Sequence, residues 1–155
     1  MLLDANTILS GSLSAAGVIT GQAVTATGNT VSTNVYDLGV GRDLGKGEAL
    51  EIAIQVTVAP LGGTTVQFAL VESDDAAVSV NPQVIVQTDA FAIAVLTAGT
   101  QVPLHWDRAA PYVARRYISL RYTLVGTFTA GSYFANITKS IADPGTYYAN
   151  GFAVL

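Results

Sequence analysis

The sequence has no cysteine, a single histidine and few charged residues, and each shortage excludes a class of function. Without cysteine the chain has no disulfide, no thiolate metal site and no cysteine nucleophile. Charged residues make up 12% of the chain, against about 25% in an average soluble domain. A surface covered mainly by Thr, Ser, Gln, Asn, Gly and Ala favours a protein that works inside a larger assembly.

Basic charge and long apolar runs are scarce as well. The net charge of −4 and the pI of about 4.6 argue against a nucleic-acid-binding protein, because that affinity comes from Lys and Arg neutralising phosphates. The longest apolar run, residues 90–96, is far shorter than the roughly 20 residues that span a bilayer. No basic region typical of a secretory signal precedes Asp4. We therefore expect a soluble protein made in the cytoplasm, with no membrane partner.

The sequence does contain apolar and polar residues that alternate with period two. In residues 50–58 every second residue from Ile52 onward is Ile or Val, a pattern typical of half-buried antiparallel strands. Turn residues separate such segments, for example at 59–63 and 129–132. Further strands are predicted at residues 18–25, 31–36, 65–73, 84–88, 91–96, 102–106, 117–125, 133–139 and 151–154. So many short strands predict an all-β fold, an antiparallel β-sandwich of jelly-roll type.

A chain of 155 residues is long enough for one domain with its own core. Residues 1–17 differ from the rest because they are small and uncharged apart from Asp4. They are either a frayed terminus or an extended N-terminal arm that adds a strand to a neighbouring subunit. We expect residues 18–155 to form the single sandwich domain.

A glycine-rich segment lies just before the strand at 50–58 and resembles a phosphate-binding loop at first sight. Its four glycines are Gly39, Gly41, Gly45 and Gly47. A P-loop, however, needs glycine where Val40 stands and Ser or Thr after Lys46, and both conditions fail. Such loops also aim backbone N–H groups from the start of a helix, whereas an alternating strand follows here. We expect a structural turn and no nucleotide cofactor.

Residues that could support catalysis or metal binding are few. His105 is the only histidine and has no accompanying nucleophile motif. Glu72, Asp74 and Asp75 form an acidic cluster, but the alternating oxygen ligands of a calcium loop are missing. We therefore expect no catalytic residue, no metal, no cofactor and no small-molecule substrate, so that the protein is not an enzyme.

One basic strip stands out between residues 108 and 122. It combines four arginines with three tyrosines: Arg108, Arg115, Arg116, Arg121, Tyr112, Tyr117 and Tyr122. Stacking on tyrosine would allow single-stranded nucleic acid to bind, but Arg and Tyr are also enriched in protein interfaces. We favour a protein contact through Arg108, Arg115, Arg116 and Tyr117. Neighbouring residues of a strand point to opposite faces, so Arg115 and Arg116 are expected in a turn before Tyr117.

Four stretches, in order, resemble the small cement, or decoration, proteins of tailed-bacteriophage capsids. They are "VYDLGVGRDLGKGEALEIAIQVTV", "ESDDAAVS", "LTAGTQVPLHW" and "RRYISLRYTLVG", within residues 35–126. The resemblance implies a jelly-roll fold and symmetric oligomers, dimers or trimers, on the outer surface of the virion capsid. There they would bridge neighbouring subunits of the major capsid protein and stiffen the shell.

Two other functions stay open beside this one. A carbohydrate-binding β-sandwich would use exposed aromatic side chains, for which Trp106, Tyr147 and Tyr148 are candidates. A β-sandwich hydrolase would need a catalytic constellation, and the sequence offers none.

Overall fold

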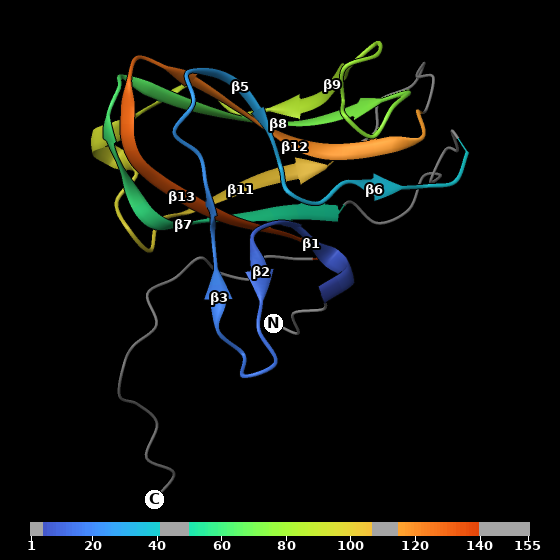
Figure 1. Ribbon diagram of the computed structural model, residues 1–155, viewed down its shortest axis with the longest axis horizontal. Helices are drawn as coiled ribbons and strands as arrows, with labels where there is room; N and C mark the ends of the chain where they lie inside the picture. Colours follow the sequence, from blue (N-terminus) through green and yellow to red (C-terminus); the bar gives the residue numbers. More distant parts are fainter. Residues whose placement is uncertain (1–4, 41–49, 107–114, 140–155) are drawn as a thin grey trace, which may run out of the picture.

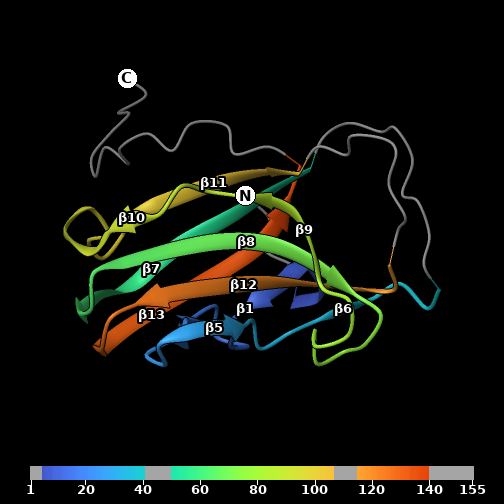
Figure 2. The same ribbon diagram turned by 90° about the horizontal axis from the view of Figure 1, so that it is seen from above.

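The computed structural model describes residues 5–40, 50–106 and 115–139, and these residues form mainly antiparallel β-strands. The strands make two sheets that face each other, one above the other in Figure 1 and both running along the molecule in Figure 2. The prediction of an all-β antiparallel sandwich is confirmed.

The first sheet has the strand order β1-β13-β7-β11, with β4 paired to another part of β13. Its strands are β1 (Ile8–Ser10), β4 (Gln22–Ala23), β7 (Leu50–Gly62), β11 (Gln101–Trp106) and β13 (Phe128–Thr138). The second sheet has the order β10-β8-β12-β5, with β9 also on β8 and β6 also on β12. Its strands are β5 (Gly28–Val31), β6 (Tyr36–Asp37), β8 (Thr65–Ser73), β9 (Gln83–Gln87), β10 (Phe91–Ala92) and β12 (Tyr117–Val125).

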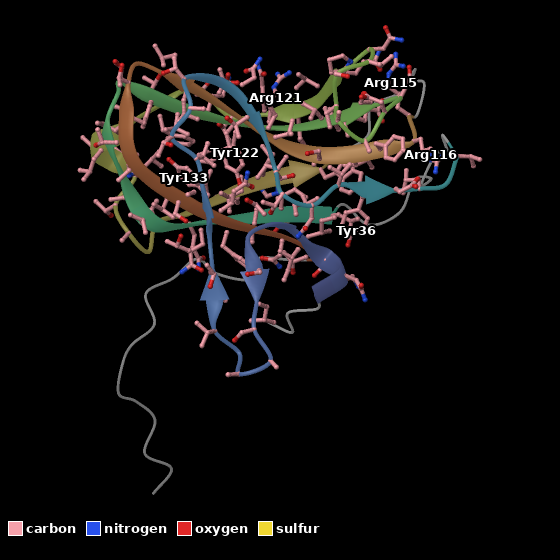
Figure 3. All side chains as sticks on the ribbon, viewed as in Figure 1. Tyr36, Arg115, Arg116, Arg121, Tyr122 and Tyr133 are labelled. Atoms are coloured by element: carbon pink, nitrogen blue, oxygen red, sulfur yellow. The ribbon has the colours of Figure 1, made fainter. Side chains whose placement is uncertain are left out.

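The core lies between the sheets and is filled by alternate residues of the long strands. On β7, β8 and β12 the buried inward-facing residues are Ile52, Ile54, Val56, Val66, Phe68, Leu70, Ile118, Leu120, Tyr122 and Leu124. At the centre the Tyr133 ring stacks on the Tyr122 ring with centroids 5.3 Å apart, and Phe68 meets both rings edge-on (Figure 3). Removing this apolar surface from water is the main force that holds the two sheets together.

The strands with the clearest alternation, β8 and β12, begin and end at the predicted residues. The turns predicted at 59–63 and 129–132 are wrong in extent, because β7 continues to Gly62 and β13 already begins at Phe128. The pairing of β7 with β13 shifts register three times between Phe128 and Tyr133, and Gly131 has a φ of 153°. Glycine and proline therefore mark β-bulges in this pair of strands, where the extra residue needs no ladder partner.

Three other predicted strands are only partly correct. The segment 91–96 forms the short β10 and then a 3-10 helix, η2 (Ile93–Val95). The segment 31–36 falls largely between β5 and β6, and the segment 18–25 is divided between β3 and β4. The strand predicted at 151–154 lies outside the described residues.

The described part of the predicted N-terminal arm belongs to the fold. After a 3-10 turn, η1 (Ala5–Thr7), β1 pairs with β13 of the same chain, and Ile8 and Leu9 are buried. Two adjacent apolar residues are too short a signal to be recognised as a strand from periodicity.

A small hairpin of β2 (Ser12–Leu13) and β3 (Ile19–Thr20) follows and projects away from the first sheet in Figure 1. Its turn is closed by the Gly17 N–H, which donates to the Ser14 carbonyl at 2.9 Å. In the ranges that the structure describes, the helices are two short 3-10 turns, and none has the length and hydrophobicity to cross a membrane.

Candidate partner-binding surfaces

The glycine-rich segment starts at the end of β6 with a turn around Asp37. The Gly39 N–H donates to Asp37 Oδ1 at 2.7 Å, and Gly39 has a φ of 77°, a region that favours glycine. Gly39 thus lies in a backbone turn of the kind that the sequence predicted. Gly41, Gly45 and Gly47 lie outside the described residues, and their structural role stays a prediction.

Arg116 forms a forked ion pair with Asp37. Its Nε and Nη2 groups donate to the two carboxylate oxygens at 2.6 and 2.7 Å, and its guanidinium lies 4.9 Å from the centre of the Tyr117 ring. The Arg116 hydrogen bond, followed by that of the Gly39 N–H, lowers the pKa of Asp37 to about 2. The same contact raises the pKa of Arg116 above its ordinary value. The pair therefore stays ionised at any physiological pH.

Arg115 is held by two carboxylates at the end of β8 and in the loop that follows it. Its Nη1 donates to Asp74 Oδ2 at 2.5 Å, and its backbone N–H donates to the buried Glu72 carboxylate at 3.2 Å. Both arginines precede β12 in irregular structure, in agreement with the predicted turn before Tyr117. The two ion pairs tie the start of β12 to β6 and to the loop after β8 (Figure 3).

The loop between β8 and β9 is organised around Asp75. Asp75 Oδ1 accepts hydrogen bonds from the backbone N–H groups of Ser79 and Val80 and from the Ser73 hydroxyl, while Oδ2 accepts one from the Ser79 hydroxyl. These donors, led by the Val80 N–H, hold the pKa of Asp75 well below its usual range. The carboxylate closes the loop, and the described residues contain no cluster of three metal-ligating side chains.

The predicted contact residues therefore divide into three cases. Arg115 and Arg116 have carboxylate partners in their own chain, the Tyr117 ring lies against Arg116, and Arg108 lies outside the described residues. Their contact with another protein stays a prediction. The pairing of the two arginines with Asp37 and Asp74 was not recognised from the sequence, because these carboxylates lie 79 and 41 residues away along the chain.

Of the remaining candidates, His105 and Trp106 occupy ordinary sheet positions on β11. Trp106 is buried in the core, so it offers no exposed ring for stacking on a sugar. Tyr147 and Tyr148 lie outside the described residues. His105 is exposed on the outer side of β11, where its Nδ1 lies 3.1 Å from Glu51 Oε1.

Arg121, which the sequence placed in the basic strip but not among the contact residues, is the described arginine without a carboxylate partner. It lies in the middle of β12, on the side of the second sheet away from Tyr122 and Tyr133 (Figure 3).

The fold is an antiparallel β-sandwich, and two ion pairs hold the start of its strand β12. A family model named Bbp16, after a Bordetella phage protein, matches residues 18–137. This match covers most of the chain, so the chain belongs to the Bbp16 family, a phage-related family. No curated protein matches the sequence.

Proposed function

We propose that the chain is a structural phage protein of the capsid cement type. In this role it binds the outside of the head and bridges neighbouring subunits of the major capsid protein. The observation that carries the proposal is the family match over residues 18–137, a range that contains all four stretches that resemble cement proteins. The proposal includes a location on the outer surface of the virion and no enzymatic activity, nucleic-acid partner, membrane partner or small-molecule substrate.

We also infer that the sandwich is a jelly roll. In a jelly roll the eight strands of two Greek keys are shared between two sheets. Counting β1, β5, β7, β8, β9, β11, β12 and β13 as these strands, the first sheet contains the first, eighth, third and sixth of them. The second sheet contains the second, seventh, fourth and fifth. This order supports the inference, because successive strands change sheet at every step except from β8 to β9, as they do in a jelly roll.

The physical basis of a cement role is mass action. A protein that binds only the assembled shell stabilises that shell by its binding free energy. When an oligomer contacts two capsomers, its second contact becomes intramolecular, so that modest affinities multiply. A rigid sandwich with a thinly charged surface is suited to such contacts.

Self-association, as a dimer or a trimer, is part of the proposal and is supported by the N-terminal quarter of the chain. Between Asp4 and Asp37 the sequence contains no charged residue, although the rest of the chain holds all 18 charges. Copies that each carry a net charge of −4 approach one another most easily through an uncharged surface. The projecting β2–β3 hairpin belongs to this segment, and an isolated two-stranded hairpin is only marginally stable in water. We therefore infer that the hairpin packs against a second copy.

The test is decoration of heads assembled without this chain, from the phage that encodes it. We expect the purified protein to cosediment with the heads at a fixed, saturable ratio and to raise the temperature at which they break open. Heads that retain no protein at concentrations of tens of micromolar would contradict the proposal, because such weak binding is not expected of an interface of standard size.

A further inference from the structure

The outer surface of the second sheet has an arginine at its centre. Arg121 pairs in register with Ala69 of β8 and with Val31 of β5, so it has a sheet strand on each side. Because Leu120 and Tyr122 point into the core, the Arg121 side chain lies on the opposite, outer side, as Figure 3 shows. It is half-buried, which fixes its aliphatic stem against the sheet.

Arg121 has no hydrogen-bond or ion-pair partner among the residues that the structure describes. Its Nε–H donor is buried without an acceptor; the Nε–H of Arg115 is too, but Arg115 pairs with Asp74 through Nη1. In the same ranges, Arg115 and Arg116 are paired with carboxylates, and Lys139 also has an interaction. A buried, unpaired donor on a charged group destabilises the fold, so Arg121 is unfavourable to the isolated chain.

The residues around Arg121 offer no carboxylate. The residues in register with it or beside it on this side of the sheet are uncharged: Asn29, Val31, Gln67 and Thr123, together with Ala69, which is buried against Val78. Three of them are engaged in hydrogen bonds, since the Thr123 hydroxyl donates to Asn29 Oδ1 and Gln67 Nε2 donates to the Thr88 carbonyl. Together with Arg121 these residues define what we call the Arg121 face.

We propose that the Arg121 face is the surface that binds the partner protein, and that Arg121 forms a forked hydrogen bond with an aspartate or glutamate of that partner. The inference rests on the proposed function, in which the partner is the major capsid protein. A planar guanidinium presents two parallel donors to a carboxylate, and the surrounding uncharged sheet excludes water when it is covered.

A second copy of this chain and a nucleic acid are poorer occupants. Two copies joined symmetrically through this face bring two Arg121 guanidinium groups towards each other, and like charges repel. A nucleic acid requires several basic side chains, whereas the Arg121 face has one and the chain is acidic overall. A carboxylate of another protein is the group that matches a single arginine.

The first test separates partner binding from folding. Arg121→Met keeps the length of the stem but removes the unpaired donor, so thermal unfolding is expected at the same temperature or higher. Arg115→Met removes the same charge from a residue paired with Asp74, and is expected to unfold at a lower temperature. If Arg121→Met lowers the melting temperature as much as Arg115→Met does, Arg121 serves the fold and the inference is wrong.

The second test is cosedimentation with undecorated heads of the same phage. We expect Arg121→Met to bind at least about tenfold more weakly than the parent, because loss of one partner leaves the other charge unpaired. Arg121→Lys is expected to recover part of the affinity and Arg121→Glu to recover none. Parent binding should also weaken as salt rises.

The outcomes of the second test are distinct. If the parent binds and folded Arg121→Glu binds equally well, the Arg121 face is not the contact, while the cement function stands. If Arg115→Met or Arg116→Met loses binding instead, the contact lies at the start of β12. If the parent itself does not bind, the proposed function fails and this inference fails with it. Binding of the parent to single-stranded DNA that Arg121→Met abolishes would also overturn the inference.

Discussion

The ion pair between Arg116 and Asp37 is formed by exposed side chains, so its contribution to stability is small but has a defined pH dependence. The pKa of Asp37 is lowered from 3.8 to about 2 in the folded protein, and the unfolded chain has the ordinary value. The stabilisation is therefore present above pH 3.8 and is lost as the pH falls towards 2.

We predict that Asp37→Asn lowers the melting temperature by about 1–3 °C at pH 7. The difference between parent and variant should close between pH 4 and pH 2. Melting curves of both proteins across this range measure it. A difference that persists unchanged at pH 2 would show that the ion pair is not its cause.

The stacked tyrosines of the core have the opposite pH dependence. Burial raises the pKa of Tyr133 to about 12 and that of Tyr122 still further, because the charged form is poorly solvated there. Among the described residues neither hydroxyl meets the geometry of a hydrogen bond, although the nearby Ser10 hydroxyl opposes part of the rise in the pKa of Tyr122. The unfolded chain therefore loses these protons first, and stability is present below pH 10 and falls as the pH rises beyond it.

We predict that the double variant Tyr122→Phe with Tyr133→Phe is at least as stable as the parent at pH 7, because it removes two unpaired polar groups. Between pH 10 and 12 the parent should lose stability more steeply than the variant. Urea unfolding at a series of pH values measures both effects. If the free energy of unfolding falls equally steeply with pH in the two proteins above pH 10, the buried tyrosines are not the cause of the pH dependence.

At the scale of elements, two turns that connect the two sheets at one end of the sandwich pack against each other. Gly126, between β12 and β13, has a φ of 97°, and a Cβ atom placed there would lie 2.8 Å from the Gly63 Cα in the turn between β7 and β8. Gly99 also has a positive φ, of 89°, but a Cβ atom there would meet nothing within 4 Å. The two glycines thus share backbone strain and differ in packing.

We predict that Gly99→Ala costs about 1–2 kcal/mol through strain alone and that Gly126→Ala costs clearly more. The additional loss comes from separating the two turns. Chemical denaturation of both variants measures the difference. Equal losses would mean that the turns adjust freely and do not brace each other.

The sequence allows prediction of the elements that alternate without interruption and fails where tertiary pairing overrides local signals. The bounds of β8 and β12 follow from period-two burial. The glycine at 131 was interpreted as a turn, although it sits in a bulge of β13 that is visible only once β7 is paired beside it. Likewise, the basic strip was recognised, but only the register of β12 with β8 and β5 separates the paired Arg115 and Arg116 from the unpaired Arg121.

At the scale of the whole molecule, the charge-free segment between Asp4 and Asp37 is proposed to join copies of the chain, and its hairpin offers a matched test. Val18, at the tip of the hairpin, is 59% exposed, and Val95, in η2, is 58% exposed. We predict that Val18→Asp shifts the protein from oligomer to monomer, because a symmetric interface brings the new charges together. Val95→Asp should leave the oligomer intact. Light scattering at micromolar concentration measures the mass, and a parent that is already monomeric would contradict the prediction.

The central claim, that the chain is a capsid cement protein, is tested most directly by a cryo-EM reconstruction of heads with and without the purified chain. The account predicts sandwich-shaped density on the outer surface, bridging neighbouring capsid subunits, with the Arg121 face turned towards the shell. Its copy number should be close to that of the capsid protein. Decorated and undecorated heads that give the same outer surface would contradict the claim.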